Sequence, residues 1–161
     1  MQEDSQEHFY NIGVSYKKAD ANTRGKFSLT KENQSSLLKL SKEKGFKGVF
    51  VISTCNRTEI SGFAQRPCQL IELLCEFSEG TIQEFAKVST IYKNQEAIHQ
   101  LFRIGTGLES QILGDYEIVG QLRQAFKLAK SLKVTNAYSE RLINSVLRAS
   151  KRVKNETKLS S

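Results

Sequence analysis

The stretch Gly48-Val-Phe-Val-Ile-Ser-Thr-Cys-Asn-Arg-Thr-Glu-Ile-Ser-Gly-Phe-Ala64 decides the predicted fold, because it contains two consecutive strands with a few polar residues between them. Residues 48–53 are almost wholly apolar, which is typical of a central strand that is covered on both faces. Residues 58–64 alternate between polar and apolar side chains, and we expect them to form the neighbouring strand. Cys55 then lies between the two strands, at the end of the first.

The chain before this stretch predicts one strand and one helix. Residues 10–16 alternate with a period of two, which predicts a strand with one buried face. After a polar connection, Thr30 can cap a helix over about residues 31–43, and Gly45 is suited to end that helix.

The chain after this stretch predicts a second helix and a fourth strand. Pro67 suits the first turn of a helix, and apolar residues recur at helical spacing as far as Phe77. Residues 88–92 are the fourth strand candidate. The first 93 residues thus follow the order β-α-β-β-α-β, which predicts a ferredoxin-like antiparallel sheet of the α+β class.

A helical subdomain is predicted to follow the sheet. From Asn94 onward the apolar residues keep a helical period, with buried faces centred on 97–102, 118–129 and 138–153. We therefore expect one domain over residues 1–161, in which about 8–93 form the ferredoxin-like core and 94–153 the helical part.

Composition favours a soluble domain without metal or disulfides. No apolar run of the 161 residues approaches the roughly 18 that a membrane helix needs, and the polar start from Met1 to His8 is unlike a signal peptide. We expect a cytoplasmic chain that makes no contact with a membrane. The three cysteines form neither a C-x-x-C pair nor a cluster with histidine, which argues against a disulfide framework and a zinc site.

The positive charge is concentrated in the last quarter of the chain. Residues 121–161 contain ten Lys and Arg and two acids, Glu140 and Glu156, which gives a net charge of about +8. Residues 1–120 contain fourteen Lys and Arg and fifteen acids, which gives −1. Such a basic face is able to meet the phosphates of a nucleic acid. A solvated helix surface would give the same pattern.

Cys55 is the candidate nucleophile. A thiol at the end of a buried strand can be aimed at a cleft, and Arg57 is a cation whose proximity would favour the reactive thiolate. Thr54 and Asn56 add donors for an acyl oxygen. The alternative is an inert buried thiol. Cys68 and Cys75 share one helix face, and we interpret both as packing residues.

Four glycines lie within the segment Gly105-Thr-Gly-Leu-Glu-Ser-Gln-Ile-Leu-Gly-Asp-Tyr-Glu-Ile-Val-Gly-Gln121. They suit either a connection that grips a ligand or a tight turn in which Asp115 caps the next helix. Gly105-Thr-Gly107 resembles the start of a dinucleotide fingerprint, but Ser110 replaces its third glycine and no β-α series follows. His99 precedes this segment on a helix and can stand near the cleft.

Two segments together are highly specific for one family. Ser53-Thr-Cys-Asn-Arg-Thr-Glu-Ile60 and Leu101-Phe-Arg-Ile-Gly-Thr-Gly-Leu-Glu-Ser-Gln-Ile-Leu-Gly-Asp-Tyr-Glu-Ile-Val-Gly-Gln121 resemble the signature stretches of glutamyl-tRNA reductase, in that family's order and spacing. The resemblance extends from Ile12-Gly-Val-Ser-Tyr-Lys17 to Ala149-Ser-Lys-Arg-Val-Lys-Asn-Glu-Thr157 and covers the family's N-terminal catalytic domain.

The resemblance implies a mechanism. Cys55 attacks the ester carbonyl of glutamyl-tRNA, and hydride from NADPH reduces the resulting thioester to glutamate-1-semialdehyde, the first step of tetrapyrrole synthesis. Arg57 would offer a fork to the glutamyl carboxylate, and the acids of the second segment would offer counter-charge. The implied catalytic residues are Cys55 and His99, and the implied substrate contacts are Thr54, Asn56, Arg57, Ser110, Asp115, Tyr116, Glu117 and Gln121.

The chain departs from the family pattern at three places. The family histidine stands three residues before the position of Arg103, where this chain has Gln100, while His99 is displaced by one residue, or about 100° around a helix. Gly114-Asp-Tyr-Glu117 replaces the commoner Gly-Glu-Pro-Gln, and Ser15-Tyr16 replaces Asn-His. Whether His99 or Gln100 serves at the histidine position stays open at this point.

The resemblance also implies partners beyond this chain. The family continues with an NADPH-binding domain and a helical dimerisation domain, neither of which fits in 161 residues, so we expect NADPH to be bound outside this chain. A homodimer of the longer protein and an interaction with glutamate-1-semialdehyde aminomutase are expected on the same ground. The rival hypothesis is a non-catalytic RNA-binding ferredoxin-like module, and a cysteine phosphatase or protease is a weaker third.

Overall fold

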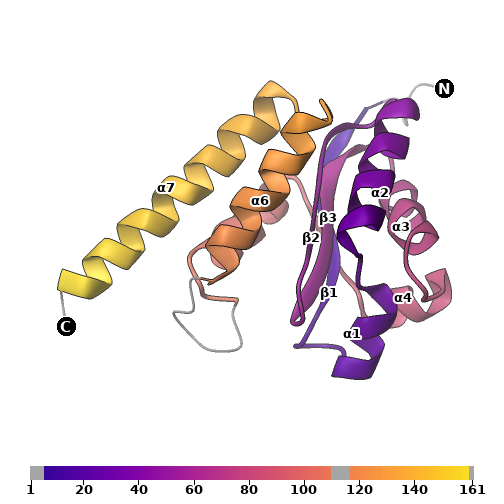
Figure 1. Ribbon diagram of the computed structural model, residues 1–161, viewed down its shortest axis with the longest axis horizontal. Coiled ribbons are helices and arrows are strands. Elements are labelled where there is room, and N and C mark those ends of the chain that lie inside the picture. Colours follow the sequence, from indigo (N-terminus) through magenta and orange to yellow (C-terminus); the bar gives the residue numbers. More distant parts are fainter. Residues whose placement is uncertain (1–5, 110–116, 160–161) are drawn as a thin grey trace.

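The computed structural model describes residues 6–109 and 117–159, which form three layers. A four-stranded sheet lies in the middle, and Figure 1 shows helices α1 to α4 on one side of it with α6 and α7 on the other. Helix α5 contacts β1 and β4 of the sheet as well as α6 and α7, so it belongs to the second helical layer.

The sheet has the predicted ferredoxin-like topology. Its strands are β1 (His8–Ser15), β2 (Lys47–Ser53), β3 (Arg57–Ala64) and β4 (Thr90–Lys93). They lie in the order β2-β3-β1-β4, and every neighbouring pair is antiparallel. The predicted α+β class and the antiparallel ferredoxin-like sheet are therefore confirmed.

Each crossover of the sheet contains two helices instead of the one predicted. Helices α1 (Ala21–Phe27) and α2 (Lys31–Glu43) connect β1 to β2, and α3 (Pro67–Glu76) and α4 (Ile82–Val88) connect β3 to β4. The polar connection expected before the helix over 31–43 contains α1, because the Asp20 side chain accepts a hydrogen bond from the Thr23 amide and starts a short helix there.

The start of the fourth strand was also predicted wrongly. Val88 is the last residue of α4, and β4 begins two residues later. Thr81 and Glu84 form a capping box at the start of α4, which stabilises a helix over residues that the prediction left between elements.

Three helices close the described chain, as predicted: α5 (Gln95–Gly105), α6 (Glu117–Ser131) and α7 (Ala137–Leu159). Their apolar faces pack on the sheet and on one another, with Leu101, Leu122 and Val146 fully buried. Although α7 has 23 residues, no helix over 6–109 and 117–159 is both long and apolar enough to cross a membrane.

The prediction that β1 buries only one face was wrong. Both faces are covered, because α5 and α7 pack over the side of the sheet that carries Phe9, Asn11 and Gly13. At one end of this side Phe9 and Phe63 contact the ring of Tyr138 from α7, with ring centroids 5.4 and 5.0 Å from it. The polar residues of β1 therefore lie inside the molecule, where they need partners.

Replacing Gly105 with alanine is expected to destabilise the fold by about 1–3 kcal/mol, because a Cβ there would lie 2.3 Å from Cγ1 of Val146. Urea unfolding measures the effect.

A second substitution, Val146→Ala, removes the methyl group that the new Cβ would meet, so the loss of unfolding free energy in the double variant should be smaller than the sum of the losses in the two single variants. Gly120→Ala in α6, where a Cβ meets nothing within 4 Å, should leave stability equal or slightly raised. Equal stability of Gly105→Ala and the parent would contradict the close packing of α5 on α7.

Candidate active site

Cys55 lies at the tip of the hairpin between β2 and β3. The Thr54 amide donates to the Arg57 carbonyl over 2.8 Å, and the Thr54 hydroxyl accepts from the amides of Asn56 and Arg57 over 3.1 and 3.3 Å. These bonds close a tight turn over residues 54–57, in which Cys55 is the exposed residue. The Cys55 residue is exposed, so the predicted nucleophile is not sealed in the hydrophobic core.

Two neighbouring segments hold the backbone of this turn. Arg24 of α1 donates from Nε to the Cys55 carbonyl over 3.1 Å and from Nη1 to the Ala19 carbonyl over 2.7 Å. The Tyr16 amide, just after β1, donates to the Asn56 carbonyl over 3.0 Å. Sequence reasoning missed Arg24 because it missed α1, and no local signal in the sequence links Arg24 to Cys55.

A small pocket joins the hairpin tip to the first turns of α6. It has a volume of about 60 Å³ and is lined by Thr54, Cys55, Asn56, Arg57, Ile104, Glu117, Ile118 and Gln121. The structure therefore brings the two signature segments together at Cys55. Of the predicted substrate contacts, Ser110, Asp115 and Tyr116 lie outside the described residues.

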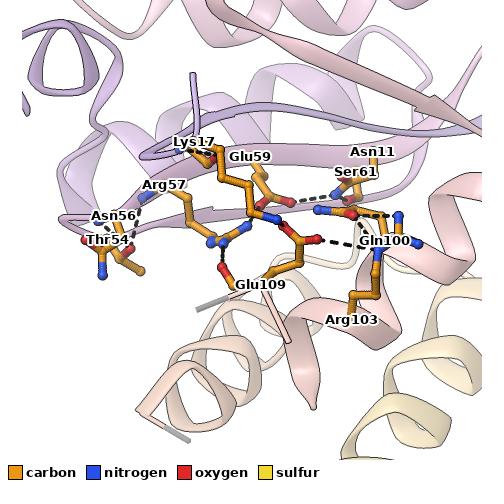
Figure 2. A network of polar contacts seen from close by, with 11 residues as sticks. Asn11, Lys17, Thr54, Asn56, Arg57, Glu59, Ser61, Gln100, Arg103 and Glu109 are labelled. Atoms are coloured by element: carbon orange, nitrogen blue, oxygen red, sulfur yellow. Dashed lines mark hydrogen bonds and ion pairs between the residues drawn. The ribbon is translucent and has the colours of Figure 1, made fainter. Parts of the chain in front are cut away.

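Arg57 is buried and engaged in a polar network under α5 (Figure 2). Its Nη1 lies 2.7 Å from Oε2 of Glu59, and its Nη2 donates to the main-chain carbonyl of Glu109. Asn11 donates from Nδ2 to Glu59 over 2.8 Å and to the Ser61 hydroxyl over 3.0 Å. Figure 2 shows the Arg57 guanidinium directed away from Thr54 and Asn56 and into this network.

Glu109 fixes the start of the segment that follows α5. Its carboxylate lies 2.8 Å from Nζ of Lys17 and 3.5 Å from Nε of Arg103, while its carbonyl accepts from Arg57. Lys17 follows β1, Arg103 is on α5 and Arg57 begins β3, so three parts of the fold converge on one residue. The chain that leads toward residue 110 is thereby held beside the hairpin.

The sequence contained a signal for this network that the prediction did not use. Arg57, Glu59 and Ser61 have the spacing of one strand face, and three polar residues there imply partners in whatever covers that face. Gly13 lies opposite Glu59 in the sheet, and a Cβ at Gly13 would lie 2.6 Å from Cγ of Glu59. Gly13 therefore provides the space that the Glu59 side chain occupies.

His99 and Gln100 lie on different sides of α5. His99 is exposed and is absent from the lining of the Cys55 pocket. Gln100 is buried at 5% exposure, and its Oε1 accepts from Nε and Nη2 of Arg103 over 3.1 and 2.8 Å. Gln100 also shares a small cavity with Arg57 and Glu59, so it is the residue at the family histidine position that faces the network.

The other two cysteines differ in their surroundings. Cys75 packs against the core as predicted, whereas Cys68 is exposed, so the prediction that both pack was wrong for Cys68. Burial raises the pKa of the Cys75 thiol to about 11. At pH 8 only about one Cys75 in a thousand is then a thiolate.

We expect a limiting dose of iodoacetamide at pH 8 to alkylate Cys75 far more slowly than Cys68, because Cys75 is half-buried and almost wholly protonated whereas Cys68 is exposed. Peptide mapping by mass spectrometry measures each rate. The Cys75 rate should rise about tenfold for each pH unit up to its pKa. A Cys75 rate equal to that of Cys68 would contradict the burial of its thiol.

The described residues form neither a metal-binding cluster nor the dinucleotide fingerprint that Gly105-Thr-Gly107 resembles. Over 6–109 and 117–159 no three His, Cys, Asp or Glu side chains form a cluster able to hold a metal ion. Gly105 ends a helix, and its Cα packs against Val146, so Gly105-Thr-Gly107 does not form the strand-to-helix turn that cradles a pyrophosphate.

Fold and site together define a class of protein: a ferredoxin-like α+β domain with an exposed hairpin cysteine that faces the start of a helix from an added helical layer. Comparison with known proteins narrows this class. The family profile described as "Glutamyl-tRNAGlu reductase, N-terminal domain" matches residues 12–157. The chain belongs to this family.

Individual relatives agree with the family match. The chain is 60% identical to glutamyl-tRNA reductase of Christiangramia forsetii and 58% identical to that of Flavobacterium psychrophilum, over 96% and 95% of this chain and 37% of each relative. The solved structure of glutamyl-tRNA reductase from Methanopyrus kandleri has a TM-score of 0.76 and 22% identity, over 95% of this chain and 36% of that one. The chain thus spans little more than a third of these relatives' length.

Proposed function

We propose that this chain is the catalytic domain of an NADPH-dependent glutamyl-tRNA reductase of tetrapyrrole biosynthesis, with Cys55 as its nucleophile. The observation that carries the proposal is the exposed Cys55 in one pocket with Arg57 and Gln121, because it joins both signature segments of the family around a thiol. The cytoplasmic location, the homodimer of the longer protein and the aminomutase partner remain predictions.

The proposed reaction of this domain is an acyl transfer. Cys55 first loses its proton to water, and the thiolate attacks the carbonyl carbon of the glutamyl ester. The bond between that carbon and the terminal ribose oxygen breaks, and the departing oxygen takes a proton from water and leaves as the tRNA hydroxyl. The product is a glutamyl thioester on Cys55. The Thr54 and Asn56 side chains are the neighbouring neutral donors for the oxyanion that forms during the attack.

Recognition of the glutamyl group is assigned to the opposite wall of the pocket. Glu117 at the start of α6 offers a carboxylate for the substrate ammonium, and Gln121, one turn later, offers an amide. Arg57 lines the same pocket, but its Nη1 and Nη2 are bonded to Glu59 and Glu109. Arg57 therefore supports the site by holding Glu109, and a direct contact with the substrate carboxylate would require another edge of its guanidinium.

Reduction is assigned to a part of the longer relatives that this chain does not match. NADPH supplies the hydride that converts the thioester to glutamate-1-semialdehyde, and no residue described here is assigned to that step. The longer relatives have room for a nucleotide-binding domain, since this chain matches only 37% of their length.

The test is to trap the thioester. Incubation of this chain with glutamyl-tRNA, followed by acid quenching and peptide mapping, is expected to give one glutamyl adduct on the peptide that contains Cys55. The adduct should be released by hydroxylamine, which cleaves thioesters. An adduct on Cys68 instead, or none at a substrate concentration that saturates binding, would refute the proposal.

The rival RNA-binding module loses its main support. Such modules stack bases on aromatic side chains of an open sheet face. Here helices cover both faces of the sheet, and Tyr10 and Phe50 are 3% and 1% exposed. No sheet face within 6–109 and 117–159 is open for stacking.

A further inference from the structure

The structure has a second, larger groove on the far side of α6 from Cys55. It has a volume of about 540 Å³ and lies between the first half of α6 and the second half of α7. In Figure 1 these two helices diverge toward the end of α7. The lining residues are Val119, Gly120, Arg123, Asn144, Leu147, Arg148, Ser150, Lys151 and Lys154.

The charge of this groove has one sign. Four of its lining side chains are cations, those of Arg123, Arg148, Lys151 and Lys154, and none is an acid. All four residues are exposed, and none forms an ion pair within the part of the chain that the structure describes. The half-buried Val119 and Leu147 lie between them. This arrangement suits a ligand with several negative charges.

The cations of α7 form a row along the groove. Positions 148, 151 and 154 lie on one face of the helix, about 4.5 Å apart along its axis. Arg123 faces them from α6. A row of like charges matches a chain of phosphates better than it matches a single anion.

The groove and the Cys55 pocket share the first turns of α6. Glu117, Ile118 and Gln121 line the pocket, whereas Gly120 and Arg123 line the groove. The two sites are therefore separated by about the 10–12 Å diameter of one helix. A nucleic-acid strand whose end is placed at Cys55 can reach the groove with the nucleotides that precede that end.

We propose that this groove, defined by Arg123, Arg148, Lys151 and Lys154, binds backbone phosphates of the RNA whose aminoacylated end is delivered to Cys55. The proposal rests on the proposed function, because it assigns the RNA part of that substrate to a surface. The contacts are to phosphates, so they fix the position of the RNA and do not read its sequence.

The first test measures binding of uncharged tRNA by fluorescence anisotropy between 50 and 200 mM salt. The double variant Lys151→Glu/Lys154→Glu should bind at least about tenfold more weakly, and its salt slope should fall by about 0.7–0.9 for each phosphate that the variant no longer neutralises. Lys127→Glu/Arg141→Glu is the matched control, because it makes the same charge change at exposed positions of α6 and α7 outside the groove. Equal weakening by both variants, or no weakening by the groove variant, would overturn the proposal.

The second test separates the groove from the chemistry at Cys55. Acylation of Cys55 by glutamyl-tRNA at subsaturating concentration should be slower in the groove variant, while acylation by a glutamyl thioester without RNA should be unchanged. Slowing of both reactions would mean that the substitutions disturb the pocket and would overturn the groove assignment. If the parent chain accepts neither acyl donor yet the groove variant still loses tRNA affinity, the proposed function fails and the groove remains. Lys151→Arg/Lys154→Arg should behave as the parent in both tests.

Discussion

Replacing Cys55 with serine is expected to slow the release of tRNA from glutamyl-tRNA at least about a thousandfold, because the seryl hydroxyl is a far weaker nucleophile near neutral pH than a thiolate. Single-turnover assays with excess protein measure this rate directly. The substitution exchanges sulfur for oxygen at an exposed position, so we expect the fold to stay the same.

The control for Cys55→Ser is the same substitution at another exposed thiol. Cys68 is exposed on α3 and lines neither the Cys55 pocket nor the groove, so Cys68→Ser should retain the full rate. Unfolding midpoints of both variants should match that of the parent. A Cys55→Ser variant that releases tRNA at the parental rate would end the case for covalent catalysis here.

Arg57→Ala is expected to lower the free energy of unfolding by about 3–5 kcal/mol. Arg57 and Glu59 are each about 95% buried, and removal of the cation would leave the Glu59 carboxylate inside the protein with Asn11 as its remaining donor. The Glu109 carbonyl would lose its bond as well. Urea unfolding followed by circular dichroism measures the loss.

A double substitution distinguishes the contribution of the two charges to stability from the contribution of the volume that the two side chains fill. Arg57→Met/Glu59→Leu fills similar volume with apolar atoms and removes both charges, so it should be more stable than Arg57→Ala alone. It should nevertheless impair acylation of Cys55, since the main-chain carbonyl of Glu109 then loses its bond to the strand that follows the hairpin tip, and only Lys17 and Arg103 still pair with the Glu109 carboxylate. If Arg57→Ala cost less than about 1 kcal/mol, the pair would not be the buried interaction seen here.

Local signals account for the elements that the sequence predicted well. The helix over 31–43 agrees with α2 because Thr30 caps its start and Gly45 ends it with a φ of 85°. Helix α1 was missed because its seven residues include Gly25, and burial of Phe27 against Phe85 supplies a tertiary contact that no local pattern reveals. Helix α4 was missed although the capping box of Thr81 and Glu84 is a readable start signal.

The candidate site, like the fold, was predicted from the sequence only in part. Cys55 and Gln121 were found because each stands in a motif, and the fold brings them to one pocket. The spacing of Arg57, Glu59 and Ser61 indicated polar partners for that strand face, but it could not identify them, because they depend on the register that sets Asn11 opposite Ser61 and on a main-chain carbonyl at Glu109. Such long-range pairings arise only when separate segments fold together.

The hydrogen bonds that anchor the hairpin tip restrict the positions that the Cys55 sulfur can occupy. Arg24 and the Tyr16 amide immobilise the carbonyls of Cys55 and of the residue after it. A cysteine has one torsion, χ1, between its main chain and its sulfur, with three staggered minima. The sulfur can therefore sample little more than three positions, and most of the entropy of reaching an attack geometry is lost by the incoming ester rather than by the enzyme.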